Sequence, residues 1–148
     1  MAAVRQATVT WNGDLPSGKG NVSGATSGAF KSLEVSWPRR SEADANGITS
    51  PEELLAASHA SCYAMALSAG LGRAGTPPES LNVSATVTFD RVGDGFKVVS
   101  SALEVRGKVP KVDAAGFQQA AEAAKDGCPI SQALKGNVDL SVKASLEK

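Results

Sequence analysis

The sequence predicts an α+β fold with an antiparallel sheet, because segments of two different periodicities follow one another along the chain. Stretches that alternate between apolar and polar residues occupy the first third and return after residue 80. Between them, residues 50–71 show helical spacing behind a strong helix start. Short turns join the strand segments, as in hairpins. At 148 residues the chain is long enough for one domain with a core, so a single domain over residues 1–148 is expected.

Six segments are predicted to be strands. They cover residues 7–11, 21–26, 33–37, 81–90, 96–106 and 138–146. The glycine-containing stretch 91–95 predicts that the fourth and fifth of these segments form a hairpin. Residues 38–49 lose all periodicity and carry the adjacent Arg39 and Arg40, which predicts a charged loop.

The long helix has the clearest start signal in the chain. Ser50 can act as N-cap, Pro51 suits the first helical position, and Glu53 would complete a capping box. The helix is predicted to run over about 50–71. The face predicted to point toward the core carries Leu55, Cys62, Met65 and Ala69. Cys62 should therefore be buried or nearly so.

A second helix is predicted over about 114–125, with Asp113 as its cap. Phe117, Ala121 and Ala124 fall on its inner side, and Gly127 ends it. Pro129 can open a further short helix through residue 134, which would place Cys128 at its N-cap.

Composition excludes several classes of function. Fifteen basic and fifteen acidic residues give a net charge of zero, and no basic cluster suggests a nucleic-acid partner. Residues 54–72 contain a histidine and several serines, so we expect no membrane span. The first residues lack the apolar stretch of a secretion signal, which predicts a reducing cytoplasm. A net charge near zero gives little protection against association and would fit a dimer.

The two cysteines are the strongest candidates for chemistry. Cys62 lies in the long helix, and Cys128 lies in the sequence Gly-Cys-Pro-Ile-Ser. Three interpretations are open: two buried apolar residues, a shared metal, or a pair that cycles between dithiol and disulfide. A metal is disfavoured, because only His59 could join the two thiols and no Cys-x-x-Cys spacing occurs.

The two thiols are expected to differ in acidity. A thiol in the middle of a helix has no helix terminus to stabilise its anion, and burial raises its pKa. Cys62 would therefore need a guanidinium, for which Arg39 and Arg40 are the candidates. Cys128 precedes a turn whose N–H groups would point toward its sulfur, so it could be the easier thiol to ionise.

His59 and Glu52 have both functional and ordinary interpretations. His59 precedes Cys62 by three residues, as in a Cys-His hydrolase pair, although a packing histidine is the more frequent case. The negative charge of Glu52 stabilises the first turn of the helix, where the helix dipole is positive. It lies ten residues before Cys62, about 15 Å along a straight helix. Glu52 could serve that thiol only through Arg39 or from a second subunit.

The chain resembles the OsmC/Ohr family of thiol peroxidases over essentially its whole length. The resemblance rests on residues 49–62 (TSPEELLAASHASC), the following Met-Ala-Leu at 65–67, and residues 127–131 (GCPIS). Residues 11–14 (WNGD) and 18–20 (GKG) add to it. The organic hydroperoxide resistance branch carries an arginine near the N-terminus, whereas residues 18–28 contain none here. The sequence is therefore more similar to the osmotically inducible OsmC branch.

The resemblance implies a fold, a reaction and a set of site residues. Antiparallel sheet would wrap around the long helix in an intertwined homodimer. Cys62 would be the peroxidatic and Cys128 the resolving cysteine, with Arg39, or less readily Arg40, as the family's arginine and Glu52 as its glutamate. Substrates would be organic hydroperoxides and hydrogen peroxide. A lipoyl-type dithiol would restore the enzyme, and no cofactor or metal would be needed.

Two other classes of function remain open at this stage. A non-catalytic redox sensor or binding domain could form the same disulfide slowly and merely change shape. A Cys-His hydrolase would use Cys62 and His59. Peroxide consumption with a dithiol separates catalysis from sensing, and ester turnover would point to the hydrolase.

Overall fold

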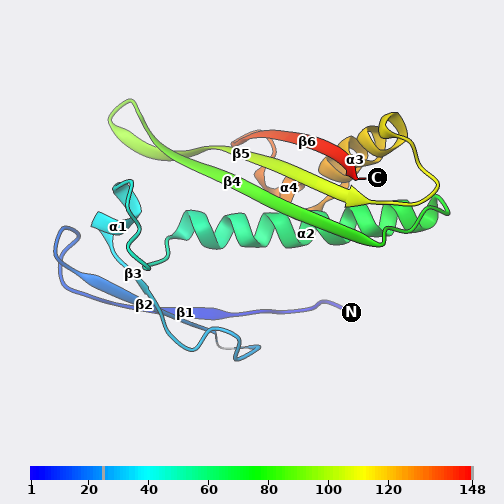
Figure 1. The fold of residues 1–148 in the computed structure, drawn as a ribbon. Coiled ribbons are helices and arrows are strands. Elements are labelled where there is room, and N and C mark those ends of the chain that lie inside the picture. Colours follow the sequence, from blue (N-terminus) through cyan, green and yellow to red (C-terminus); the bar gives the residue numbers. More distant parts are fainter. Residues whose placement is uncertain (25, 148) are drawn as a thin grey trace. The chain divides into compact units, whose positions relative to one another are not determined.

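The computed structural model describes residues 1–24 and 26–147, and the chain divides into two compact units whose boundary in the sequence follows Leu54. The first unit contains three strands and a short helix, and the second contains three strands and the remaining helices (Figure 1). The elements are β1 (Ala7–Asn12), β2 (Lys19–Gly24), β3 (Leu33–Val35), α1 (Trp37–Ser41), α2 (Pro51–Arg73), β4 (Ser80–Val92), β5 (Gly95–Lys108), α3 (Ala114–Gly127), α4 (Pro129–Leu134) and β6 (Asp139–Glu147). The α+β class and the predicted order of strands and long helices are confirmed, whereas the single domain stays a prediction.

The first unit is an antiparallel sheet in the order β1-β2-β3 with one apolar face. Val9 pairs with Val22, which in turn pairs with Leu33, and these three form an apolar row across the sheet. The neighbouring row is Trp11, Gly20 and Val35. A Cβ on Gly20 would lie 2.7 Å from Val35 and 2.9 Å from the Trp11 ring, so only glycine lets these two side chains approach.

The expected loop over residues 38–49 is wrong at its start, because Trp37–Ser41 form the single helical turn α1. Ser36 precedes it with extended backbone, and the Arg40 N–H donates to the Ser36 carbonyl at 3.0 Å. Pro38 sits in the first turn, where its missing N–H costs nothing. One turn is too short to show a helical period in the sequence.

Helix α2 begins and ends through specific capping contacts. The Ser50 hydroxyl accepts from the Glu53 N–H at 3.1 Å, as predicted, but the Glu53 carboxylate accepts from the Thr49 hydroxyl rather than from the Ser50 N–H. At the other end, the Thr76 N–H donates to the Leu71 carbonyl, and Gly75 adopts a φ of +77°. This Schellman-type end requires the left-handed conformation that glycine provides. The helix therefore extends two residues beyond the predicted end.

The predicted core face of α2 is wrong, because Met65 is 68% exposed. The buried stripe instead carries His59, Tyr63, Leu67 and Leu71, none more than 1% exposed. Alanine and other small residues surround the helix on every side, so its apolar pattern does not select one face. By length and composition α2 could even cross a membrane, contrary to the expectation from its polar residues, although the core helices of soluble proteins pass the same test.

The sheet of the second unit is mixed rather than antiparallel. Strands β4 and β5 form the predicted hairpin, and the apolar residues of β4 alternate toward one face as expected. Strand β6, however, pairs with β5 in parallel, with Leu103 opposite Val142. Helices α3 and α4 carry the chain back between these strands, and such a crossover returns the chain in the same direction.

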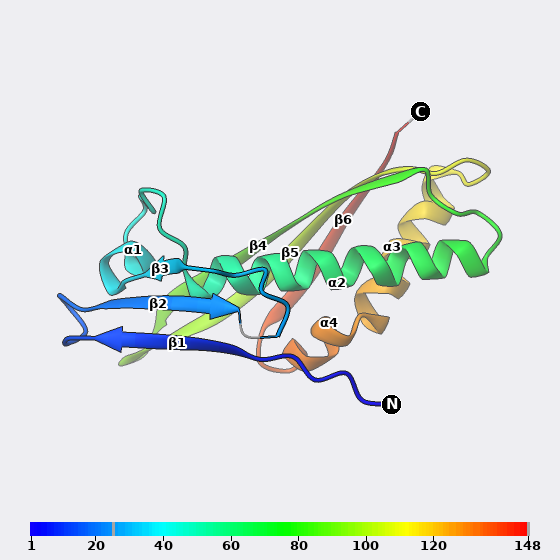
Figure 2. The same cartoon turned by 90° about the horizontal axis from the view of Figure 1, so that it is seen from below.

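Helices α2 and α3 share one core with strand β5. Figures 1 and 2 show α2 lying along the β4-β5-β6 sheet, with α3 and α4 beside it. Leu103 and Val105 of β5 are 1% exposed and belong to the same apolar cluster as Tyr63 and Phe117. The Tyr63 hydroxyl donates to the Ala121 carbonyl at 3.0 Å. The cap at Asp113, the inner side of α3 and the short helix after Cys128 are confirmed.

Candidate active site

The two thiols lie next to each other although 66 residues separate them in sequence. Cys62 projects from α2, is half-buried and packs against the apolar cluster that contains Cys128, and the two thiols affect each other's pKa. Cys128 lies at the junction of α3 and α4 and is fully buried. A reagent can therefore reach the pair from the side of Cys62.

The local environments give the two thiols opposite acidities. Burial is the main cause that raises the pKa of the Cys62 thiol, and the Ile130 N–H opposes it only in part. Burial also acts to raise the pKa of the Cys128 thiol. The polar groups near the sulfur outweigh that burial and lower the pKa of Cys128, chiefly the Ser131 N–H and then the Cys62 thiol, the Ser131 hydroxyl and the Ile130 N–H. Within this unit Cys128 is the thiol that ionises more readily.

His59 lies in the core beside this pair, with both ring nitrogens occupied. Its Nδ1 is 2.7 Å from the Ser101 hydroxyl of β5, and its Nε2 is 2.8 Å from the Ser131 hydroxyl of α4. Burial lowers the pKa of His59. The histidine is fully buried and neither nitrogen is left to take a proton from Cys62, so this arrangement gives no support to the Cys-His hydrolase.

The carboxylate of Glu52 binds Arg40 and not Arg39, which corrects the expected pairing. The Arg40 Nε lies 3.2 and 3.1 Å from the two carboxylate oxygens, and its Nη2 lies 2.8 Å from one of them. Glu52 is 8% exposed. This fork geometry fixes the guanidinium plane and makes the pair stronger than a surface ion pair.

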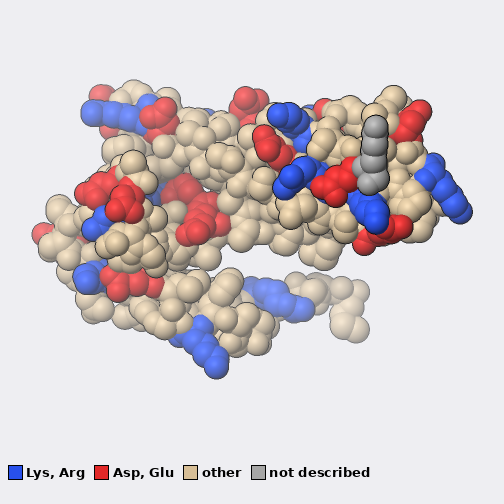
Figure 3. Space-filling model, in the orientation of Figure 1, with Lys and Arg blue, Asp and Glu red and all other residues tan. Residues whose placement is uncertain are grey.

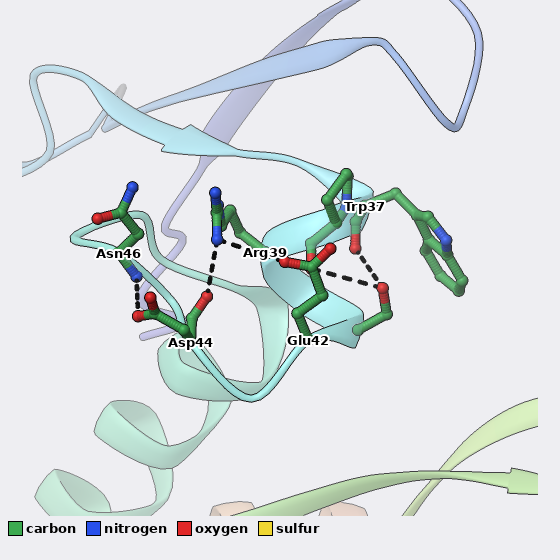
Figure 4. A network of polar contacts seen from close by, with 7 residues as sticks. Trp37, Arg39, Glu42, Asp44 and Asn46 are labelled. Atoms are coloured by element: carbon green, nitrogen blue, oxygen red, sulfur yellow. Dashed lines mark hydrogen bonds and ion pairs between the residues drawn. The ribbon is translucent and has the colours of Figure 1, made fainter.

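Arg39 has a different set of partners. Its Nη1 lies 3.3 Å from the Glu42 carboxylate and 3.1 Å from the Asp44 carbonyl (Figure 4). All these groups belong to α1 and the loop after it, so Arg39 stabilises that loop. The side chains of successive helical residues point about 100° apart. Arg39 and Arg40 are successive residues of α1, so their side chains point in different directions.

Sequence reasoning ranked one contributor to these contacts too low and missed two others. Arg40 is the less favoured arginine of the resemblance, and a one-turn helix leaves no periodic signal to show which arginine points toward Glu52. Ser131 follows Cys128 by three residues and could have been recognised as a residue of the first turn of α4. Ser101 lies in an alternating strand and carries no sequence signal, because only the tertiary fold brings it to His59.

The distribution of titratable groups gives no sign of other site types in the described residues. Residues 1–24 and 26–147 contain no cluster of three His, Cys, Asp or Glu side chains that could hold a metal ion. On the face shown in Figure 3, acidic and basic side chains lie side by side, so that face offers no basic stripe to a polyanion.

Comparison with known proteins places this pair of thiols in a family. The sequence model described as OsmC-like protein matches residues 43–143, which contain both cysteines. The chain belongs to the OsmC-like family. It is 39% identical over 140 residues to the peroxiredoxin OsmC of Escherichia coli, covering 95% of this chain and 96% of that protein.

Other relatives of this OsmC-like chain are more distant. The organic hydroperoxide resistance protein of Xanthomonas axonopodis is 30% identical over 110 residues, covering 74% of this chain and 75% of that protein. The higher identity to the peroxiredoxin supports the assignment of this chain to the OsmC branch of the family. Among solved structures, OhrB of Bacillus subtilis matches with a TM-score of 0.75 at 26% identity, covering 97% of this chain and 100% of that one. An OsmC-like protein from Mycoplasma pneumoniae shares the fold with a TM-score of 0.74, 14% identity and full coverage of both chains.

Proposed function

We propose that this OsmC-family thiol peroxidase reduces hydroperoxides through a two-cysteine cycle of Cys62 and Cys128. The adjacency of the two thiols carries the proposal. The Cys62 thiolate attacks a peroxide oxygen, so the O–O bond breaks, an S–O bond forms and an alcohol or water leaves. Cys128 then attacks the Cys62 sulfur, forming the disulfide and expelling the oxygen as water. A dithiol reduces the disulfide by exchange and is itself oxidised.

Exposure decides which cysteine meets the peroxide. Cys128 is fully buried, whereas Cys62 is accessible on one side. The first S–O bond therefore forms at Cys62. Cys128 needs only to reach the neighbouring sulfur, which it already contacts.

Activation of Cys62 requires a nearby cation. Burial raises the pKa of that thiol, and a nearby positive charge would lower it again. We assign this role to Arg40, because Glu52 already holds its guanidinium in a fixed plane. Glu52 lies about 15 Å along α2 from Cys62. A second chain in the intertwined homodimer is therefore the proposed source of the arginine.

The proposed substrates are organic hydroperoxides and hydrogen peroxide, and the proposed reductant is a lipoyl-type dithiol. The names of the relatives, a peroxiredoxin and a hydroperoxide resistance protein, support the first part. A dithiol suits a buried disulfide because its second thiol closes the exchange within one bound molecule. A reducing cytoplasm is the proposed compartment, since both thiols must return to the reduced state.

Single-turnover kinetics of the two cysteine variants test the cycle. Cys62→Ser is expected to consume no peroxide, because Cys128 is buried. Cys128→Ser is expected to consume one equivalent of cumene hydroperoxide and stop at a sulfenate, detected by intact mass and dimedone labelling. Wild-type protein should form an intramolecular disulfide and turn over with dihydrolipoamide. One equivalent consumed by Cys62→Ser would reverse the assignment, and sustained turnover by Cys128→Ser would remove the resolving role. A disulfide without turnover would identify a sensor.

A further inference from the structure

A line of three hydrogen-bonded polar residues crosses the apolar core and ends beside Cys128. Ser101, His59 and Ser131 are 0%, 0% and 2% exposed, and they are bonded in that order at 2.7 and 2.8 Å. Ser131 lies three residues after Cys128 in the first turn of α4, and its hydroxyl acts to lower the pKa of the Cys128 thiol. The three residues come from β5, α2 and α4, so the line joins elements that are distant in sequence.

The proton count fixes one direction for these hydrogen bonds. The Ser131 hydroxyl has a single proton, and a thiolate at Cys128 can only accept. When Ser131 donates to the sulfur, its oxygen must accept from an Nε2–H of His59. The neutral ring then presents Nδ1 as an acceptor, and the Ser101 hydroxyl donates to it. Every bond in the line thus points toward the sulfur.

We propose that Ser101, His59 and Ser131 form a relay of hydrogen bonds that holds Cys128 as a thiolate, making His59 and Ser131 positioning residues for disulfide formation. The proposal rests on the two-cysteine cycle proposed above. A thiolate at Cys128 attacks the Cys62 sulfenic acid directly, so the S–S bond forms as the S–O bond breaks and hydroxide leaves to take up a proton. When a dithiol attacks the Cys62 sulfur to reduce the disulfide, Cys128 leaves readily as a thiolate.

The composition of the core supports a role beyond packing. His59 occupies the position on the buried stripe of α2 that Tyr63, Leu67 and Leu71 continue. A leucine there would need no partners, whereas a buried imidazole must satisfy both nitrogens. Burial lowers the pKa of His59, so the ring stays neutral and keeps the acceptor nitrogen that the relay requires.

The other titratable groups around Cys128 leave its titration interpretable. Cys62 and Tyr63, both from α2, interact with it, and Glu122 of α3 interacts with Tyr63. Burial raises the pKa of Tyr63, so the phenol remains protonated across the range in which Cys128 titrates. Replacing Cys62 by serine removes the competing thiol. Absorbance of the thiolate near 240 nm then reports Cys128 alone.

Titration of Cys128 in the Cys62→Ser background tests the relay. Ser131→Ala is expected to raise the measured pKa of Cys128 by about one pH unit, because a hydrogen bond to an anion is lost. His59→Leu should raise it in the same direction, and His59→Gln should restore it, since an amide N–H can donate to Ser131. Tyr63→Phe is the matched control: it removes a buried hydrogen bond one turn along the same helix, and the pKa of Cys128 should not move.

A second readout follows the chemical steps with Cys62 present. In Ser131→Ala, peroxide consumption should stay within about twofold of wild type, while disulfide formation at pH 7 slows about tenfold, the change that one pH unit produces in the thiolate fraction. Raising the pH above the new pKa should remove the difference. An unchanged Cys128 pKa in both Ser131→Ala and His59→Leu overturns the relay, as does an equal shift in Tyr63→Phe.

The two readouts separate this proposal from the proposed function. If Cys62 consumes no peroxide in the wild-type protein, the two-cysteine cycle fails, yet the titration still measures whether the relay lowers the pKa of Cys128. If His59→Leu does not fold, as judged by circular dichroism, Ser131→Ala and His59→Gln still decide the outcome, because each keeps either the imidazole or a polar group in its place.

Discussion

Arg39 and Arg40 are adjacent residues of one helical turn, but different groups hold them. Glu52, whose side chain is 10% exposed, holds Arg40 through a part-buried fork, whereas Arg39 bonds to Glu42 and to a loop carbonyl. Arg40→Ala is expected to slow the peroxide step about 100-fold, since loss of a neighbouring cation raises a thiol pKa by one to three units. Stopped-flow peroxide consumption measures the rate, and a pH titration of Cys62 in the Cys128→Ser background measures the pKa.

Arg39→Ala is the matched control for that prediction. It removes the same charge one residue away, and its ion pair is partly exposed, so the peroxide rate should change less than about threefold. Glu52→Gln should reproduce part of the Arg40 defect, because a neutral amide holds the guanidinium less firmly. Equal losses in both arginine variants, or a loss in Arg39→Ala alone, would refute the assignment of Arg40.

At this scale the sequence can name residues that belong to a recognisable motif, but it cannot show contacts that the tertiary geometry decides. Cys62, Cys128 and Glu52 could be named because their motifs are recognisable in the chain. The choice between Arg39 and Arg40 depends on the direction in which one residue of a single turn points. Ser101 depends on the register of β5 against a helix 42 residues earlier, which no local pattern encodes.

At the scale of elements, Gly107 of β5 governs how closely the sheet approaches α3. A Cβ at this position would overlap the Phe117 ring and lie 3.1 Å from Leu81. Gly107→Ala is therefore expected to lower the free energy of unfolding by about 1–3 kcal/mol through overpacking. Urea unfolding at one fixed protein concentration measures the change.

A second glycine on the same strand supplies the control. A Cβ at Gly95 would meet no atom within 4 Å, so Gly95→Ala should change the free energy of unfolding by less than about 0.5 kcal/mol. If Gly107→Ala is as harmless as Gly95→Ala, then Phe117 can move away, and the close contact between β5 and α3 is not what limits the packing.

The types of the elements could be predicted from the sequence, whereas the direction of β6 and the buried face of α2 could not. Alternation located the six strands of the described residues, and capping residues located α2, α3 and α4, because both are local properties of the chain, whereas the single turn α1 was expected to be a loop. The parallel pairing of β6 depends on the return path through α3 and α4, and the length of that connection was the available clue. The buried face of α2 was ambiguous because small apolar residues surround the whole helix.

At the scale of the molecule, the apolar face of the β1-β2-β3 sheet raises the question of what covers it. Val9 is 57% exposed and Trp11 is 40% exposed, although their neighbour Val22 is 7% exposed. Exposed apolar residues that adjoin one another on one face mark an interaction site. Met65 of α2 is also largely exposed. A second copy of this chain is the expected cover.

Sedimentation equilibrium at protein concentrations between about 1 and 100 μM should therefore find a homodimer, because stable dimers persist in this concentration range. Val9→Glu places a charge on the apolar face of β1 and should weaken the dimer at least about tenfold, because an unpaired carboxylate would have to be buried. Thr10→Glu is the control: the neighbouring side chain points to the opposite face of the same strand, so association should be unchanged. If Arg40 of one chain serves Cys62 of another, the Val9→Glu protein should also lose peroxide activity on dilution in step with its dissociation. A monomeric wild-type protein that keeps full activity at the lowest concentration would contradict both the dimer and the shared site.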